Sequence, residues 1–186
     1  MLAYSSIAHA GYILMGVASA NQTGMAGALF YLLAYTFTNI GAFAVLTAMA
    51  RPEGENQTFP AYRGLYRRSP GLALMMMIFM LSLTGIPLTG GFIGKYYLFL
   101  SAIEANLYWL AIIGVLTSVV SAFFYLRVIV DMFMREAEPG QEVKAVHYAP
   151  LNWTINLTAL ATFVLGVVPT SALALVQLAA KLLMGT

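Results

Sequence analysis

The chain has 186 residues, of which 61% are hydrophobic and 9% charged, and its mean hydropathy is +0.82. Soluble domains carry about 25% charged residues, so an ordinary globular protein with a solvated surface is excluded. The net charge of +2 forms no basic stripe, which argues against nucleic-acid binding, and the lack of cysteine excludes disulfides and thiolate metal sites. Charged side chains are missing from four long runs, namely 1–50, 69–94, 105–126 and 145–180. We therefore expect lipid to surround most of the chain.

The apolar runs predict membrane-spanning helices. Residues 72–81 do not alternate between apolar and polar types, which favours helices over a transmembrane barrel. The run 1–50 is long enough for two helices, and the turn formers at 21–24 divide it. The predicted helices are 3–20, 25–50, 71–103, 106–134 and 149–181. The sequence thus predicts an all-α bundle of about five spanning helices in a single membrane domain, 1–186, with one polar loop at 51–70.

The distribution of basic residues predicts the orientation. If the first helix starts in the cytoplasm, the loops 51–70 and 135–148 are cytoplasmic too. They carry six basic residues, namely Arg51, Arg63, Arg67, Arg68, Arg135 and Lys144. The opposite side receives only Lys181, so we expect a cytoplasmic N-terminus and an outside C-terminus. The chain opens with no basic flank and no cleavage pattern, so it resembles the middle of a larger protein, and whether Met1 is a true start stays open.

The segment 71–103 is too long for one straight crossing. As a helix it would extend about 50 Å, whereas the hydrocarbon core is about 30 Å thick. Its centre contains residues that interrupt helices, namely Gly85, Pro87, Gly90 and Gly91. We therefore predict a discontinuous helix of the kind that lines ion sites in transporters. A proline kink that serves only packing is the alternative.

Lys95 follows this break by about one helical turn and precedes the end of the segment by about 12 Å. A charged group near the middle of a bilayer costs about 2.5–3.5 kcal/mol on insertion scales, so it is expected to face the bundle interior. Burial disfavours the ammonium form, and such an amine can gain and lose a proton. Lys95 is therefore a candidate proton relay. A lysine that reaches the membrane surface, or one neutralised by a structural carboxylate, is the alternative.

His9 is a second relay candidate because an imidazole can pass a proton between its nitrogens. It shares a helical face with Ser5, Tyr12 and Gly16. Similar polar faces occur on the next helix and on 106–134, and they include Tyr31, Tyr35, Thr38, Asn39, Gly114, Ser118, Ser121 and Tyr125. Such stripes more often serve close helix packing. The residues that could form a polar axis are Ser5, Tyr12, Tyr35, Ser118, Ser121 and Tyr125. Arg127 and Asp131 are spaced for a structural ion pair near the cytoplasmic end.

No nucleotide-binding loop, Rossmann fingerprint, HExxH motif or GxSxG elbow occurs in the sequence. Ser5 and Ser6 lie near His9 without an acid that would orient the imidazole, so a hydrolase triad is not supported. We expect no cofactor and no metal in this chain.

Two stretches resemble subunit N of the proton-translocating NADH-quinone oxidoreductase, respiratory complex I. They are 2–12, LAYSSIAHAGY, and 81–97, LSLTGIPLTGGFIGKYY, and shorter matches occur at 62–65 and 121–128. The similarity covers the chain nearly end to end. The lysine that closes the GFIGK stretch is more similar to subunit N than to the related subunit M, whose pattern would place a glutamate there.

The resemblance implies a fold and a role. The family has fourteen helices with two inverted five-helix repeats, and this chain resembles the tenth to fourteenth. By that resemblance Lys95 is the lysine of the second broken helix, a proposed proton-channel residue, and His9 belongs to the polar axis. The family's glutamate on its fifth helix and its lysines on the seventh and eighth have no positions here.

The same resemblance implies a non-redox subunit of a translocase in the bacterial inner membrane, which couples electron transfer from NADH to quinone with proton export. NADH, FMN, iron–sulfur clusters and quinone would lie on other subunits, and the partners would be other membrane subunits and lipid. A subunit of a multisubunit cation/proton antiporter is an alternative, because it shares the broken helix and the lysine. A structural helix bundle with an inert Lys95 is another.

Overall fold

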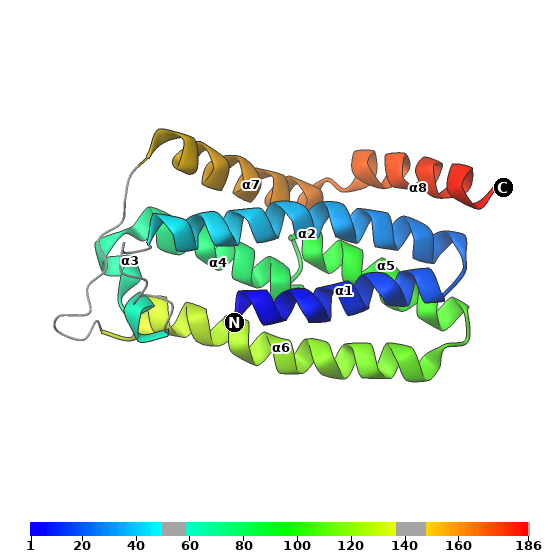
Figure 1. Cartoon of the computed structure of the whole chain (residues 1–186), viewed down its shortest axis with the longest axis horizontal. Helices are drawn as coiled ribbons and strands as arrows, with labels where there is room; N and C mark the ends of the chain where they lie inside the picture. The colour runs from blue at the N-terminus through cyan, green and yellow to red at the C-terminus, as the bar shows by residue number, and fades with distance from the viewer. Residues whose placement is uncertain (50–58, 137–147, 186) are drawn as a thin grey trace.

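The computed structural model describes residues 1–49, 59–136 and 148–185. These residues form eight α-helices and one short 3-10 helix, and they contain no strand. The main helices run side by side along one long axis (Figure 1). The prediction of an all-α helical bundle is confirmed.

The first two helices form a hairpin. Helix α1 spans Leu2–Ala18 and α2 spans Gln22–Ala48. Asn21 caps α2, because its side chain accepts a hydrogen bond of 2.7 Å from the Gly24 N–H. The turn formers at 21–24 therefore separate two helices, and most of them belong to the first turn of α2.

The segment after the polar loop is divided in the middle. The short η1 (Phe59–Tyr62) and α3 (Leu65–Arg68) lead into α4, which spans Pro70–Thr84, and α5 follows at Gly90–Glu104. Pro70 occupies the first turn of α4, where its missing N–H costs nothing. The predicted discontinuity in 71–103 is confirmed and lies at residues 85–89.

The prediction of one helix over 149–181 is wrong. Helix α6 (Tyr108–Met134) is continuous, but the last segment divides into α7, Ala149–Val167, and α8, Thr170–Met184. Pro169 lacks an N–H, its ring clashes with the carbonyl four residues earlier, and it pushes the preceding residue out of helical geometry. Val168 accordingly has φ −126° and ψ 65°.

By length and composition, three helices in the described part of the chain can each cross a membrane, namely α2, α6 and α7. Helices α1, α4 and α8 are apolar but shorter. The count differs from the five crossings predicted because α1 has 17 residues and because 71–103 forms two helices of 15 residues each.

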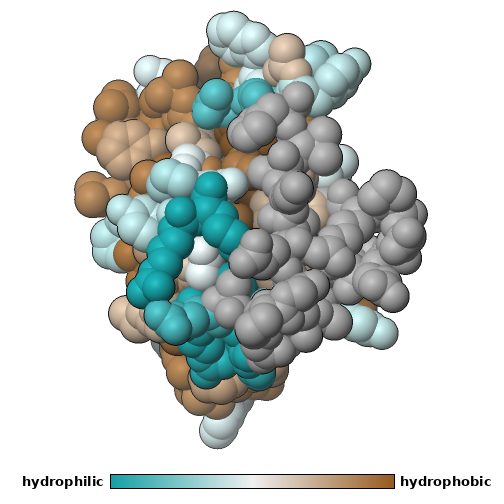
Figure 2. All heavy atoms as spheres, turned by 90° about the vertical axis from the view of Figure 1, so that its left-hand side faces the viewer, coloured by the Kyte–Doolittle hydropathy of each residue, from teal (hydrophilic) through white to brown (hydrophobic). Residues whose placement is uncertain are grey.

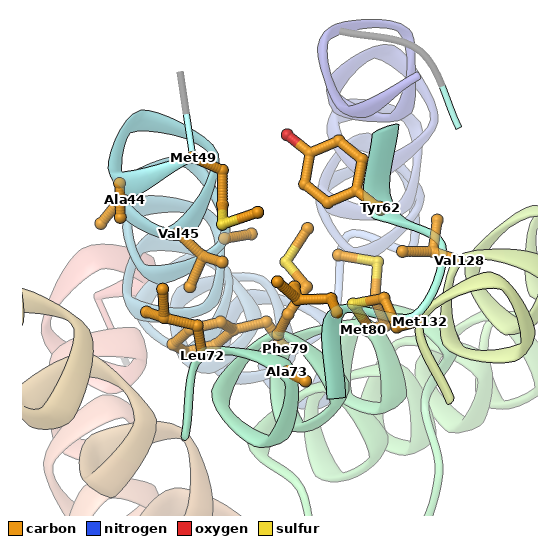
Figure 3. Packing of buried hydrophobic residues seen from close by; sticks show 14 of the residues in the cluster. Ala44, Val45, Met49, Tyr62, Leu72, Ala73, Phe79, Met80, Val128 and Met132 are labelled. Atoms are coloured by element: carbon orange, nitrogen blue, oxygen red, sulfur yellow. The ribbon is translucent and has the colours of Figure 1, made fainter. Parts of the chain in front are cut away.

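Helix α2 is the centre of the bundle and packs against α1, α4, α5, α7 and α8. The largest apolar cluster joins the C-terminal half of α2 to α4, η1 and α6, and Figure 3 shows part of it. Val45, Phe79, Met80 and Met132 are fully buried in it. Outward-facing apolar side chains on α6, such as Trp109 and Phe123, are exposed, as expected for a helix that faces lipid.

Hydrophilic side chains gather at the end of the bundle that carries α3 (Figure 2). Asp131 of α6 is buried there, and Arg135 lies 2.8 Å from its carboxylate. Arg63 lies 3.8 Å away and Arg127 4.0 Å away. Among the described residues, the predicted pair of Arg127 and Asp131 is therefore the longest of the three contacts. Arg51, Lys144 and the last residue of the predicted helix 25–50 lie outside the described residues.

Candidate functional site

The end of α4 is closed by a hydrogen-bonding pattern known as the Schellman motif. Gly85 takes the left-handed conformation, with φ 88°, that glycine adopts without strain. Its N–H donates to the Ser82 carbonyl, and the Ile86 N–H donates to the Leu81 carbonyl, both at 3.0 Å. In a continuous helix the Leu83 carbonyl would accept from residue 87, but Pro87 has no N–H to donate. The break therefore frees a backbone acceptor inside the bundle.

The Lys95 side chain donates a hydrogen bond to this acceptor. Its Nζ donates to the Leu83 carbonyl at 2.9 Å and to the Thr84 carbonyl at 3.1 Å. These carbonyls form the C-terminal, negative end of the α4 dipole, which stabilises a cation. Lys95 comes from the second turn of α5 and is 4% exposed. The amine thus joins the two halves of the broken helix from within the protein.

Two more side chains complete the surroundings of the amine. Its third bond, of 3.0 Å, goes to the Ser118 hydroxyl of α6. The ring of Tyr12 from α1 lies 4.9 Å from Nζ, within the range of a cation–π contact. An ammonium has three donors, and here each has an oxygen acceptor. The site therefore suits the charged form of Lys95 without exposing it to water.

A second polar group surrounds His9 of α1, which is 1% exposed. Its Nε2 lies 2.9 Å from the Tyr125 hydroxyl of α6, and its Nδ1 is hydrogen-bonded to the Tyr31 hydroxyl of α2. The Tyr35 ring stacks on the imidazole with 4.8 Å between centroids. Because a neutral imidazole has one donor and one acceptor, one tyrosine accepts from His9 and the other donates to it.

The hydrogen-bonded chain continues toward a cavity. The Tyr125 hydroxyl also bonds to Ser5 Oγ, and both residues line a cavity of about 400 Å³ between α1, η1 and α6. Ser121 lines the same cavity. The Tyr12 ring lies 5.9 Å from the imidazole, so Tyr12 contacts both His9 and Lys95. Its hydroxyl is directed elsewhere, to Thr117 Oγ1 at 3.3 Å.

Most of the predicted polar residues thus lie in two adjacent groups. The His9 group is surrounded or extended by Ser5, Tyr12, Tyr35 and Tyr125. Ser118 belongs to the Lys95 group, and Ser121 lines the cavity. Sequence reasoning missed the direct role of the Tyr31 hydroxyl and of the α4 carbonyls. A proline four residues after Leu83 was the available signal for the freed carbonyl. Gly90 and Gly91 lie where α5 begins, directly against neighbouring helices.

No group of three or more His, Asp or Glu side chains that could hold a metal ion occurs among residues 1–49, 59–136 and 148–185. The site contains a buried amine and a buried imidazole that are held by hydroxyls and backbone carbonyls. Such groups can hold and pass protons.

Residues 1–121 match the family described as the transmembrane proteins of NADH:quinone oxidoreductase and Mrp antiporters. The chain belongs to this family. With its apolar helices, membership makes it a multi-pass membrane protein.

Relatives in the family have known names. The chain is 49% identical over 183 residues to NADH-quinone oxidoreductase subunit N of Trichlorobacter lovleyi, an alignment that covers 98% of this chain and 37% of the relative. It is 50% identical to subunit N 1 of Herpetosiphon aurantiacus, covering 91% of this chain and 34% of that one. The chain thus spans little more than a third of the length of these relatives.

Solved structures show the same fold. A chain of respiratory complex I from Thermus thermophilus with bound aureothin aligns with a TM-score of 0.80 and 34% identity, covering 93% of this chain and 38% of that one. A chain of the Mrp complex from a Dietzia species aligns with a TM-score of 0.84 and 22% identity, covering 97% and 41%. At that identity the second likeness concerns the fold alone.

Proposed function

We propose that the chain is part of a proton-translocating membrane subunit of NADH-quinone oxidoreductase, of the subunit N type, in which Lys95 relays protons. The observation that carries the proposal is the buried Lys95 amine, bonded to carbonyls that a helix break has freed. A buried ionisable group at broken backbone is typical of ion paths in membrane proteins. The names of the relatives point to the same subunit.

Lys95 would accept a proton, hold it as an ammonium against the Leu83 and Thr84 carbonyls, and release it when the charges around the site change. His9 would be the second relay residue. Its chain of hydroxyls runs from Ser5 through Tyr125 to the imidazole, so a proton that enters at the cavity has a hydrogen-bonded route inward. Tyr12 presents its ring to the amine, and a water molecule would have to bridge His9 and Lys95.

The redox chemistry would belong to other subunits. The chain has no cysteine for iron–sulfur ligation. We propose that NADH, FMN, the iron–sulfur clusters and quinone are bound by partner subunits, as expected for a non-redox subunit of this type, and that this chain contacts other membrane subunits of the complex. The arginines at the α3 end favour a cytoplasmic location of that end in a bacterial cell membrane, which puts the C-terminus outside.

Lys95→Ala in the full-length subunit, assembled in the complex and reconstituted into vesicles, tests the proposal. We expect assembly to persist and the protons pumped per NADH oxidised to fall. Lys95→Arg should be impaired too, because an arginine stays protonated and cannot release its proton. Lys181→Ala is the matched control, since that lysine is exposed in α8.

Unchanged pumping in Lys95→Ala would refute the relay and favour an inert helix bundle. A cation/proton antiporter, the remaining alternative, would show sodium-dependent proton exchange in vesicles without any NADH oxidation.

A further inference from the structure

Three buried hydroxyls meet beside the helix break. Thr38 of α2 and Ser82 of α4 are each 1% exposed, and Thr162 of α7 is fully buried. The Thr38 hydroxyl oxygen lies 3.1 Å from that of Ser82 and 3.3 Å from that of Thr162. The relay proposed above uses none of these residues.

The donors and acceptors of this hydroxyl cluster, Thr38, Ser82 and Thr162, can be assigned. The Thr38 hydroxyl donates its single proton to the Ala34 carbonyl at 2.8 Å, so its oxygen accepts from the other two hydroxyls. Ser82 donates to Thr38, and its oxygen accepts from the Gly91 N–H at 3.2 Å. That N–H belongs to the first turn of α5, where backbone donors have no helical partner.

The cluster therefore fixes α5 against α4 close to Lys95. Ser82 directly precedes Leu83, whose carbonyl accepts from the amine, and Gly91 lies one turn before Lys95. A Cβ at Gly91 would overlap the Ser82 carbonyl oxygen, so the backbones of the two half-helices touch there. The Ser82–Gly91 and Leu83–Lys95 hydrogen bonds set the same register between α4 and α5.

The two bonds respond differently when a proton moves. An amine that releases a proton loses a donor and its charge, which weakens its hold on backbone carbonyls. Serine and threonine hydroxyls carry no charge, so the hydroxyl cluster keeps its bonds at that moment. Thr38 ties this cluster to helix α2, which packs against most of the bundle.

We propose that Thr38 and Ser82 are positioning residues that hold the two halves of the broken helix in register while Lys95 exchanges its proton. This inference rests on the function proposed above, in which Lys95 is the relay. Neither residue touches the amine, and both act through the backbone that surrounds it.

The test uses the assembled complex in vesicles, with proton pumping and quinone reduction measured together. Thr38→Val keeps the shape but removes the hydroxyl, and Thr38→Ser restores it. Thr36→Val is the matched control, because Thr36 lies on the same helix, bonds to the Leu32 carbonyl at 2.8 Å and faces outward. We expect protons pumped per NADH oxidised to fall in Thr38→Val, because valine loses the bond to the Ala34 carbonyl and both bonds to the Ser82 and Thr162 hydroxyls. Thr38→Ser and Thr36→Val should pump like the unmodified complex.

Lys95→Ala separates the two proposals. If Lys95→Ala pumps normally, the relay and this inference both fail. If Lys95→Ala stops pumping but Thr38→Val behaves like Thr36→Val, only the inference fails. It also fails if Thr38→Val lowers pumping and quinone reduction in equal proportion, because that result indicates general damage to the fold. If Thr38→Val does not assemble, Ser82→Ala is judged by the same criteria.

Discussion

The conformation of Gly85 makes a quantitative prediction. Its φ of 88° lies in the left-handed region, which costs a residue with a side chain about 1–2 kcal/mol. An alanine Cβ there would also lie 3.0 Å from Lys95 Cδ, so the lysine would have to move by a few tenths of an ångström. Alanine offsets part of the cost, about 0.4–1 kcal/mol, by restricting the unfolded chain. We expect Gly85→Ala to lower the free energy of unfolding by about 1 kcal/mol.

Gly71→Ala is the matched control, since Gly71 lies in the same helix and nothing approaches its added Cβ within 4 Å. That variant should be neutral or slightly more stable. The assay is unfolding of the purified chain in mixed micelles with increasing dodecyl sulfate, followed by circular dichroism. Because the lysine must shift, Gly85→Ala should also reduce pumping in the assembled complex. Equal stability of the two variants would refute the claim that the left-handed conformation at Gly85 requires glycine.

Three further predictions concern other contacts. Gly166→Ala should lower the free energy of unfolding by about 1–3 kcal/mol in the same assay, because the added Cβ would overlap the Leu88 carbonyl. Asp131→Asn should lower it by about 1–3 kcal/mol, because three arginines would lose their buried counter-ion while remaining partly solvated; a value near zero would contradict this. Burial raises the pKa of Tyr62 to about 12 from 10.0, so its contribution to stability is complete below pH 10 and is lost as the pH rises toward 12. When the free energy of unfolding is measured at pH 10 and at pH 12, the Tyr62→Phe variant should not show this loss.

The sequence predicted the parts of the fold that depend on local chemistry. Apolar runs, the turn formers at 21–24 and the Gly-Pro-Gly pattern of 85–91 each act within a few residues, so the helices and the break follow from them. Pro169 carries the same kind of signal, but the prediction of one helix over 149–181 overlooked it because the run 145–180 contains no charged residue. A proline in the middle of a long apolar run indicates a boundary even when no charged residue accompanies it.

Partners that come from distant helices could not be predicted. The spacing of Ser5, His9 and Tyr12 placed them on one face of α1, but not that Tyr31 and Tyr125 approach the imidazole from α2 and α6. The carbonyls that bind Lys95 are invisible in a side-chain pattern, since every residue has one. Asp131 was assigned a single partner four residues away, whereas Arg63 reaches it from a different segment. Tertiary packing decides such contacts.

The bond between Lys95 and the Leu83 carbonyl has an evolutionary consequence. Pro87 leaves the carbonyl without a backbone donor, and Lys95 donates to it instead, so a substitution at one position affects the other. A glutamate in place of the lysine would bring only acceptors when ionised and would leave the carbonyl unsatisfied. We expect positions 87 and 95 to covary across related sequences, and those that carry an acid at position 95 to have rebuilt the loop before it.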